Sequence, residues 1–128
     1  MNLREYRAAA HILSERHKKT PESALLSNVM HLLCRLPGVQ AIRMNSGMAN
    51  HSGRIVRYGY PGMADILVRR RRNKFEPWEV VWIELKARGG KQSDAQMAFQ
   101  QHVEAWGDRY VLARSVNEVL TAMEVEHA

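Results

Sequence analysis

The spacing of apolar residues along the chain predicts four helices. In the second, leucine and valine side chains recur every three or four positions, which is the spacing of one face of an α-helix. Thr20 and Pro21 stand at its start, where a threonine can cap the helix and a proline fits the first helical position. The four expected helices cover residues 3–19, 21–35, 93–106 and 115–124.

Short apolar runs between turn residues predict strands. These runs cover residues 39–44, 54–58, 64–70, 79–87 and 109–113. Residues 45–53 are rich in glycine, asparagine and serine and are expected to form a loop. The resulting order, α-α-β-β-β-β-α-β-α, predicts an α/β fold with a mixed β-sheet flanked by helices.

Length and composition are typical of a single soluble domain. The chain of 128 residues is long enough to bury one hydrophobic core. No apolar stretch approaches the ~18 residues of a membrane span, and the N-terminus lacks the apolar region of a signal peptide. We therefore expect an intracellular, cytoplasmic protein with no membrane partner. The lone cysteine, Cys34, excludes a disulfide framework, and we expect it to be buried on a helix.

The charge of the chain favours a polyanionic partner. Lysine and arginine outnumber aspartate and glutamate by 19 to 13, and the sequence pI is near 9.9. The excess is concentrated between residues 54 and 91, where acidic residues are few, which predicts a basic rim around an acidic centre. For the run of four arginines at 69–72, a solvated hairpin tip is the ordinary alternative.

Three charged side chains in two consecutive predicted strands form a candidate catalytic site. If the strands make a hairpin in which Arg70 faces Glu79, the same register places Asp65 opposite Glu84 on one face of the sheet. Lys86 is two residues beyond Glu84 and therefore shares that face. Two carboxylates that can share a cation, next to an ammonium group, are the parts required for metal-assisted phosphodiester hydrolysis. The alternative is a structural ion pair with Lys86, which would need only one carboxylate.

The order and spacing of several segments resemble the VRR-NUC domain, a branch of the PD-(D/E)xK nuclease superfamily. The segments are PGMADILV (61–68), VVWIELKARGGKQSDAQMAF (80–99) and DRYVLARSVNEV (108–119), with TPESALLSNVMHLL (20–33) and RMNSG (43–47) upstream. The resemblance covers about residues 20–123 and implies a restriction-endonuclease-like core in a stand-alone nuclease domain. Ala64 stands where the superfamily usually has proline, but alanine can adopt the same extended backbone, so we expect the chemistry to be retained.

The resemblance implies a role for each residue of the candidate site. Asp65 and Glu84 would bind the metal ion directly, with the backbone carbonyl of Leu85 as a further ligand. Such oxygen ligands suit Mg²⁺ or Mn²⁺. Lys86 would hold or deprotonate the attacking water, or stabilise the negative charge that develops on phosphorus.

Two further residues have a structural alternative beside the implied catalytic role. Glu22 matches an acidic residue on the early helix of the family, which would contact the metal, through water, or hold a second ion. In the first turn of its helix, Glu22 would equally satisfy the helix dipole. Gln96 matches the helix glutamine that follows the catalytic strand of the family. However, Ser93 to Gln96 also has the pattern of a capping box, and the same pattern recurs at residues 115–118.

The resemblance implies a divalent-metal-dependent DNA endonuclease that cuts branched DNA, such as four-way (Holliday) junctions, as a symmetric homodimer. Residues 1–19 are the candidate dimer contact. Basic side chains would position the DNA through its phosphates. These are Arg54, Arg57, Arg69, Arg70, Arg71, Arg72, Arg88 and Lys91. The alternatives are a nuclease of flap, single-strand or duplex specificity on the same site, and a non-catalytic nucleic-acid-binding domain.

Overall fold

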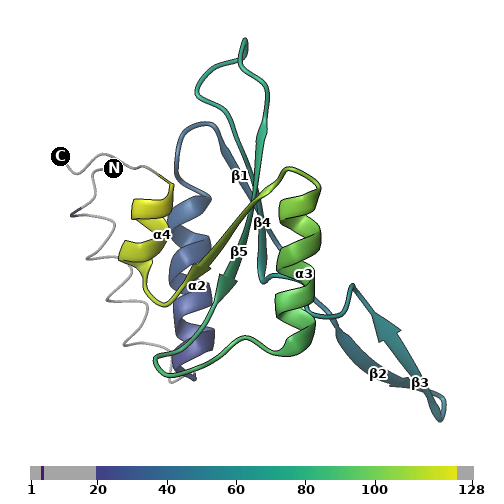
Figure 1. The fold of residues 1–128 in the computed structure, drawn as a ribbon. Helices are drawn as coiled ribbons and strands as arrows, with labels where there is room; N and C mark the ends of the chain where they lie inside the picture. The colour runs from purple at the N-terminus through teal and green to yellow at the C-terminus, as the bar shows by residue number, and fades with distance from the viewer. Residues whose placement is uncertain (1–3, 5–19, 124–128) are drawn as a thin grey trace.

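A computed structural model describes Arg4 and residues 20–123 and shows a mixed α/β fold (Figure 1). In chain order the elements are α2 (Pro21–Leu33), β1 (Val39–Arg43), β2 (Gly47–His51), β3 (Arg54–Tyr58), β4 (Ile66–Arg70), β5 (Glu79–Leu85), α3 (Asp94–Ala105), β6 (Arg109–Ala113) and α4 (Val116–Ala122). The helix expected over residues 3–19 and the candidate dimer contact in 1–19 lie, apart from Arg4, outside the described residues. None of the described helices has the length and apolar character that a membrane crossing requires.

Four strands form a mixed sheet in the order β1-β4-β5-β6. The first two pairings are antiparallel and the third is parallel. Because β6 runs parallel to β5, the chain must cross over the sheet between them, and α3 makes this crossover. Helices α2 and α4 lie on one face of the sheet and α3 lies on the other (Figure 1). The expected α/β fold with a mixed sheet is therefore confirmed.

The two faces of the sheet bury different residues because strand side chains alternate in direction. On the α2 and α4 face, Ile83 and Leu85 of β5 are buried in a core with Val29 and Val119. On the opposite face, Trp82 packs against Phe99 of α3, with their ring centroids 5.1 Å apart. This alternation leaves Glu84 on the α3 face.

The register of the β4–β5 hairpin agrees with the prediction. Arg70 pairs with Glu79, and the same ladder continues to Ile66 opposite Ile83. Both strands are shorter at this end than expected, because β4 begins after Asp65 and β5 ends before Lys86.

Two local expectations are wrong. Residues 45–53 are not all loop, because β2 pairs with β3 in a separate two-stranded sheet. The turn of this hairpin places Ser52 and Gly53 at φ values of 52° and 82°, and the Asn50 side chain accepts a hydrogen bond from the Gly53 amide at 3.1 Å. Ser52 and Gly53 therefore form the two-residue turn of the hairpin, and the Asn50 side chain supports it. Cys34 is exposed rather than buried, because it lies at the C-terminal cap of α2.

Candidate active site

Asp65 accepts hydrogen bonds from two backbone amides, one with its side chain and one with its own carbonyl. Its carboxylate Oδ2 accepts from the Leu85 amide at 2.8 Å. Its own carbonyl accepts from the Met44 amide at 2.8 Å, just beyond the end of β1. In the register of the β4–β5 ladder, the residue that faces Asp65 is Glu84. The hairpin therefore brings these two carboxylates together, as the sequence predicted.

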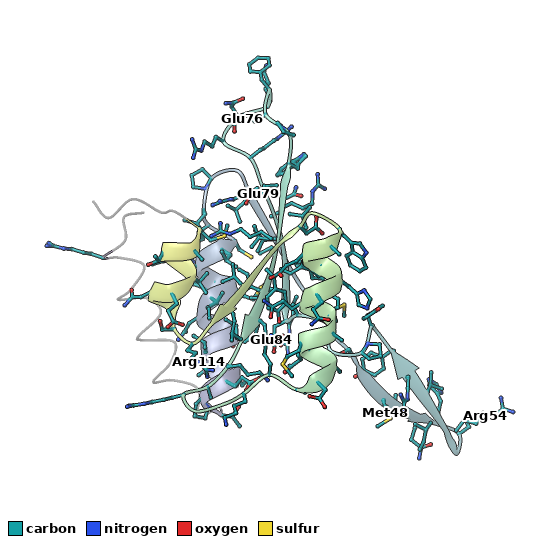
Figure 2. The ribbon with its side chains drawn as sticks, viewed as in Figure 1. Met48, Arg54, Glu76, Glu79, Glu84 and Arg114 are labelled. Atoms are coloured by element: carbon teal, nitrogen blue, oxygen red, sulfur yellow. The ribbon has the colours of Figure 1, made fainter. Side chains whose placement is uncertain are left out.

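Glu84 is a buried carboxylate with one oxygen satisfied and one not. The residue is only 1% exposed and lies inside the body of the fold (Figure 2). Its Oε1 accepts a hydrogen bond from the Gln96 side-chain amide at 2.8 Å and lies 3.8 Å from the Lys86 ammonium. Its Oε2 is buried without a hydrogen-bond partner. Buried polar atoms normally have partners, so this oxygen marks a place for a proton or a cation.

The two carboxylates shift each other's ionisation. Burial, and after it the neighbouring Asp65 charge, raise the pKa of Glu84 to about 8, against the opposing effect of the Lys86 ammonium. Burial also raises the pKa of Asp65, although its hydrogen bond from the Leu85 amide acts in the opposite direction. Two acids in one desolvated site cannot both ionise easily without a compensating positive charge. The pair therefore holds a proton near neutral pH unless a cation replaces it.

Lys86 lies beside Glu84, as the strand alternation predicted. Its side chain is 13% exposed, and its ammonium reaches only the Oε1 side of the carboxylate. Ile83 and Leu85 point to the opposite face, into the core. A structural ion pair would explain the contact between Lys86 and Glu84 but not the position of Asp65 beside them.

Gln96 combines the two roles that the sequence left as alternatives. Its side-chain carbonyl accepts from the Ser93 amide at 2.8 Å, and the Ser93 hydroxyl accepts from the Gln96 amide at 3.2 Å, so the capping box is formed. The remaining NH₂ group of the same side chain donates to Glu84. The cap therefore orients Gln96 toward the buried carboxylate.

The second expected capping box is only half formed. The Ser115 hydroxyl accepts from the Glu118 amide at 3.1 Å, which makes Ser115 the N-cap of α4. The Glu118 carboxylate, however, accepts from the Arg114 amide, one residue earlier than a capping box requires. The prediction of a second capping box is therefore wrong for the hydrogen bond that the Glu118 side chain makes.

Glu22 lines the same hollow as Asp65. It is exposed in the first turn of α2, where the Thr20 hydroxyl accepts from the Ser23 amide and caps the helix as predicted. The hollow has a volume of about 570 Å³, and Asp65 and Leu85 also line it. The charge of Glu22 contributes to the raised pKa of Asp65. Among the described residues, no three His, Cys, Asp or Glu side chains are grouped to hold a metal ion. The candidate cation site is therefore the Asp65–Glu84 pair, and Glu22 lines the hollow that Asp65 also lines.

Two residues near the site were not predicted. Arg43 lines the same hollow, because β1 pairs with β4 and places Arg43 opposite Ile66, next to Asp65. Tyr110 of β6 lies opposite Trp82, and burial raises its pKa to about 12, with further contributions from the charges of Glu84 and Asp65. Both positions depend on pairings between strands that are distant in the sequence.

The arginine run at 69–72 does not surround the carboxylates. The run begins at the other end of β4 from Asp65, and Figure 2 shows Glu79 at that end and Glu84 at the site end. The Arg70 guanidinium pairs with Glu79 at 2.7 Å and donates to the Met123 carbonyl. The expected basic rim is wrong for this segment, because the strand separates it from the site.

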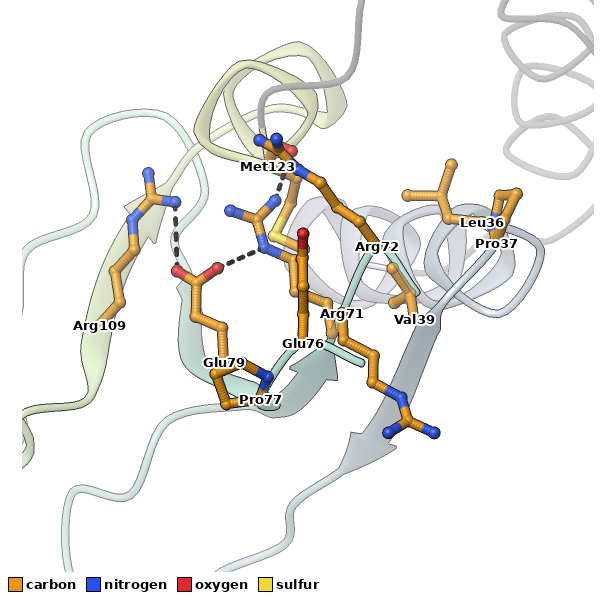
Figure 3. Close-up of a pocket in the computed structure, with 11 residues that line it drawn as sticks. Leu36, Pro37, Val39, Arg71, Arg72, Glu76, Pro77, Glu79, Arg109 and Met123 are labelled. Atoms are coloured by element: carbon orange, nitrogen blue, oxygen red, sulfur yellow. Dashed lines mark hydrogen bonds and ion pairs between the residues drawn. The ribbon is translucent and has the colours of Figure 1, made fainter. Parts of the chain in front are cut away.

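Much of the arginine run is already engaged with neighbouring side chains. Arg69 and Arg71 stack on Trp78 at 4.4 and 4.3 Å from its ring centroid. Figure 3 shows the hollow of about 670 Å³ that the run lines, with the Glu79 carboxylate turned toward Arg109.

The other predicted phosphate contacts lie in two places. Arg88 and Lys91 are exposed in the loop between β5 and α3, which begins at Lys86. Arg54 and Arg57 are exposed on β3. Of the predicted basic contacts, Arg88 and Lys91 are therefore in the loop that leaves β5 at its Glu84 end.

Comparisons with protein-family models, with curated proteins and with solved structures gave no match to this chain. The resemblance to the VRR-NUC domain and its restriction-endonuclease-like core therefore stays a prediction. Evidence on function comes from the chemistry of the site itself.

Proposed function

We propose that the protein is a divalent-metal-dependent DNA endonuclease that hydrolyses phosphodiester bonds. The observation that carries this proposal is the Asp65–Glu84 pair, in which Glu84 is buried, its Oε2 has no hydrogen-bond partner and Lys86 lies on the other oxygen. In a purely structural role, a second carboxylate beside the buried Glu84 would add to the cost of burying that charge.

The residues present fit Mg²⁺ or Mn²⁺. Magnesium is usually bound by one or two carboxylates, and water and substrate phosphate oxygens complete its shell. Asp65 and Glu84 supply two carboxylates, and the Leu85 carbonyl is a further candidate ligand. When bound, such an ion polarises the phosphate and lowers the pKa of a water molecule.

The protein side chains have distinct roles in this proposal. Gln96 holds Glu84 Oε1 through a 2.8 Å hydrogen bond, which leaves Oε2 free for the cation. Lys86 holds or deprotonates the attacking water, or stabilises the negative charge that forms on the phosphate oxygens. Glu22 contacts the cation through water at the mouth of the hollow, or holds a second ion. Arg43, Arg88 and Lys91 attract the phosphate backbone toward the site.

Branched DNA, such as a four-way junction, is the substrate class we propose. Symmetric cleavage of a junction requires two active sites, and one chain carries one carboxylate pair, so the active form would be a homodimer with two-fold symmetry. Nucleases specific for flaps, single strands or duplexes would use the same side chains, and the substrate panel below separates these possibilities.

The test is cleavage by Lys86→Ala and Glu84→Gln on labelled four-way junction, flap, duplex and single-stranded DNA with Mg²⁺. Both variants should lose at least about 100-fold in cleavage rate, since Lys86 acts on the attacking water or the reacting phosphate and Glu84 holds the cation. EDTA should abolish wild-type cleavage. The matched control is Lys74→Ala, an exposed lysine in the loop at the far end of the sheet, which should cleave as the wild type does.

Binding measured on the same DNA distinguishes an enzyme from a non-catalytic binding domain. Retained binding with lost cleavage in the Lys86→Ala variant supports the nuclease. Cleavage that is unchanged in both site variants would contradict the assignment. Binding without any metal-dependent cleavage by the wild type would favour a non-catalytic domain.

A further inference from the structure

The β2–β3 hairpin forms an arm that projects from the body of the molecule (Figure 1). It is a two-stranded sheet of its own, and every residue of β3 is exposed. Ile55 is 74% exposed and Met48 is 64% exposed. A two-stranded hairpin alone is only marginally stable in water, and exposed apolar side chains on such an element indicate a surface that another molecule covers.

The charge of the arm identifies the kind of molecule. Residues 40–64, which include the whole arm, contain no aspartate or glutamate. Arg54 and Arg57 are three positions apart on β3, so they project to opposite faces and make both faces positive. On one face Arg57 lies beside Met48 and near Ile55, and on the other Arg54 is followed by Val56. A ribbon that combines cationic and apolar side chains on each face fits the groove of a nucleic acid.

A second copy of the arm is a poorer fit than a nucleic acid. Two such arms would bring arginines together without a carboxylate to pair with them, and like charges on facing strands are destabilising. A polyanion instead gains from both arginines.

Both ends of the arm are attached to segments that carry the candidate active site. At the entry, the Met44 amide donates to the carbonyl of Asp65 at 2.8 Å. At the exit, Gly62 lies so close to the start of α3 that an added Cβ would be 2.6 Å from the backbone nitrogen of Gln96. The arm is therefore attached at both ends close to residues of the carboxylate site.

We propose that the β2–β3 arm is a DNA-binding ribbon that enters a groove of the substrate, with Arg54 and Arg57 on phosphates and Ile55 against the sugars or bases. This inference rests on the proposed function, because the DNA that the arm holds would be the substrate of the candidate active site. The contact would be made by one projecting element and not by the net charge of the whole chain.

The test compares two double variants with the same loss of charge. Arg54→Gln with Arg57→Gln neutralises the arm, and Arg72→Gln with Lys74→Gln neutralises the loop at the opposite end of the sheet. Fluorescence anisotropy with labelled duplex and four-way junction in EDTA measures binding without cleavage, over a series of salt concentrations. The arm variant should bind at least about 10-fold more weakly, and its slope of log K against log salt should fall by about two, as expected for two lost phosphate contacts. The loop variant should keep the wild-type slope.

Two results would overturn the arm proposal. One is a wild-type slope in the arm variant, and the other is an equal fall in both double variants, which would indicate net charge alone. Sedimentation of the Ile55→Ser variant tests whether the arm binds a second copy of the chain. If Ile55→Ser converts a dimer into a monomer and the salt slope of the arginine variant is unchanged, the arm is a contact between protomers. Circular dichroism establishes folding, and all five substituted positions are exposed.

The outcome for the arm is separable from the outcome for the nuclease. If the wild type does not cleave but the arm variant loses DNA binding, the arm proposal holds and the nuclease proposal fails. If the wild type cleaves and the arm variant binds as tightly as the wild type, the nuclease proposal holds and the arm proposal fails.

Discussion

Glu84 is the residue on which the chemistry of the site depends most. It is 1% exposed, and only one of its two carboxylate oxygens has partners. Burial beside Asp65 stabilises its protonated form, so the pKa of Glu84 is raised to about 8. The same features that make Glu84 costly as a structural residue make it a suitable ligand for a divalent cation, which would replace the proton.

The raised pKa predicts that the metal-free protein loses stability as the pH increases. Above pH 4.5 an unfolded Glu84 releases its proton, whereas the folded residue keeps it up to about pH 8. The unfolded state therefore binds fewer protons in this window, and the free energy of unfolding falls from pH 4.5 to about 8. Glu84→Gln mimics the protonated form and removes this dependence. Thermal melts in EDTA should show the variant equal to the wild type near pH 4 and more stable at pH 9, by a few kcal/mol at ~1.36 kcal/mol per pKa unit.

Glu76→Gln is the control for this measurement, because Glu76 is exposed in the β4–β5 loop. Its melting curve should follow the wild type at every pH. A Glu84→Gln variant that is less stable than the wild type at pH 9 would show that Glu84 is ionised and well paired in the folded protein.

At the scale of the element, the start of α3 links helix formation to the site. Gln96 accepts from the Ser93 amide with its side-chain carbonyl and donates to Glu84 with its NH₂ group. The capping box therefore does more than end the helix, because it limits the rotamers of Gln96 to those that reach the carboxylate.

Substitutions at the two ends of the capping box should separate these roles. Ser93→Ala removes the cap hydroxyl and should cost about 1 kcal/mol of stability, with little change in cleavage. Gln96→Ala removes a cap bond and the donor to Glu84, so it should also lower cleavage or metal affinity by about 10- to 100-fold, as for other groups that orient metal ligands. Urea unfolding and cleavage kinetics on both variants provide the comparison. Equal losses of cleavage in the two variants would show that Gln96 acts only through the helix end.

Most helices and strands could be predicted because their signals are local. Thr20-Pro21 and Ser93 mark helix starts through side-chain caps, and the spacing of apolar residues distinguishes helix from strand. β2 was missed because Gly47, Ala49 and Asn50 have little preference for strands and because β2 pairs with β3 rather than with the main sheet. A strand with neither a buried face nor a β-branched residue has no local signal of its own.

At the scale of the whole molecule, Gly62 is the point where the arm meets the body. Its φ is 72°, and an added Cβ would lie 2.2 Å from the Ala95 carbonyl oxygen. No side chain fits there without movement of the backbone of α3. The contact therefore joins the exit of the arm to the helix start that carries Gln96.

Gly62→Ala should destabilise the protein more than an alanine in the hairpin turn. Gly53 has a similar φ of 82° but no atoms within 4 Å of an added Cβ, so Gly53→Ala reports backbone strain alone, about 1–2 kcal/mol. The difference between the two free energies of unfolding measures the contact with α3. Gly62→Ala should also reduce cleavage, since it displaces Gln96. Equal destabilisation by the two substitutions would mean that α3 can move away from position 62 without a measurable cost in stability.

The sequence by itself determined the order of most elements, the β4–β5 register and the membership of Asp65, Glu84 and Lys86 in one cluster. These follow from short-range rules, because a hairpin with alternating side chains relates residues about 20 positions apart without further information. Only the tertiary structure showed that Gln96 caps α3 and binds Glu84 at once. It also showed that Arg43 lines the site hollow and that the run at 69–72 lies at the other end of the strands. These facts depend on where α3 and β1 pack against the sheet, and packing joins residues whose relation no local pattern encodes.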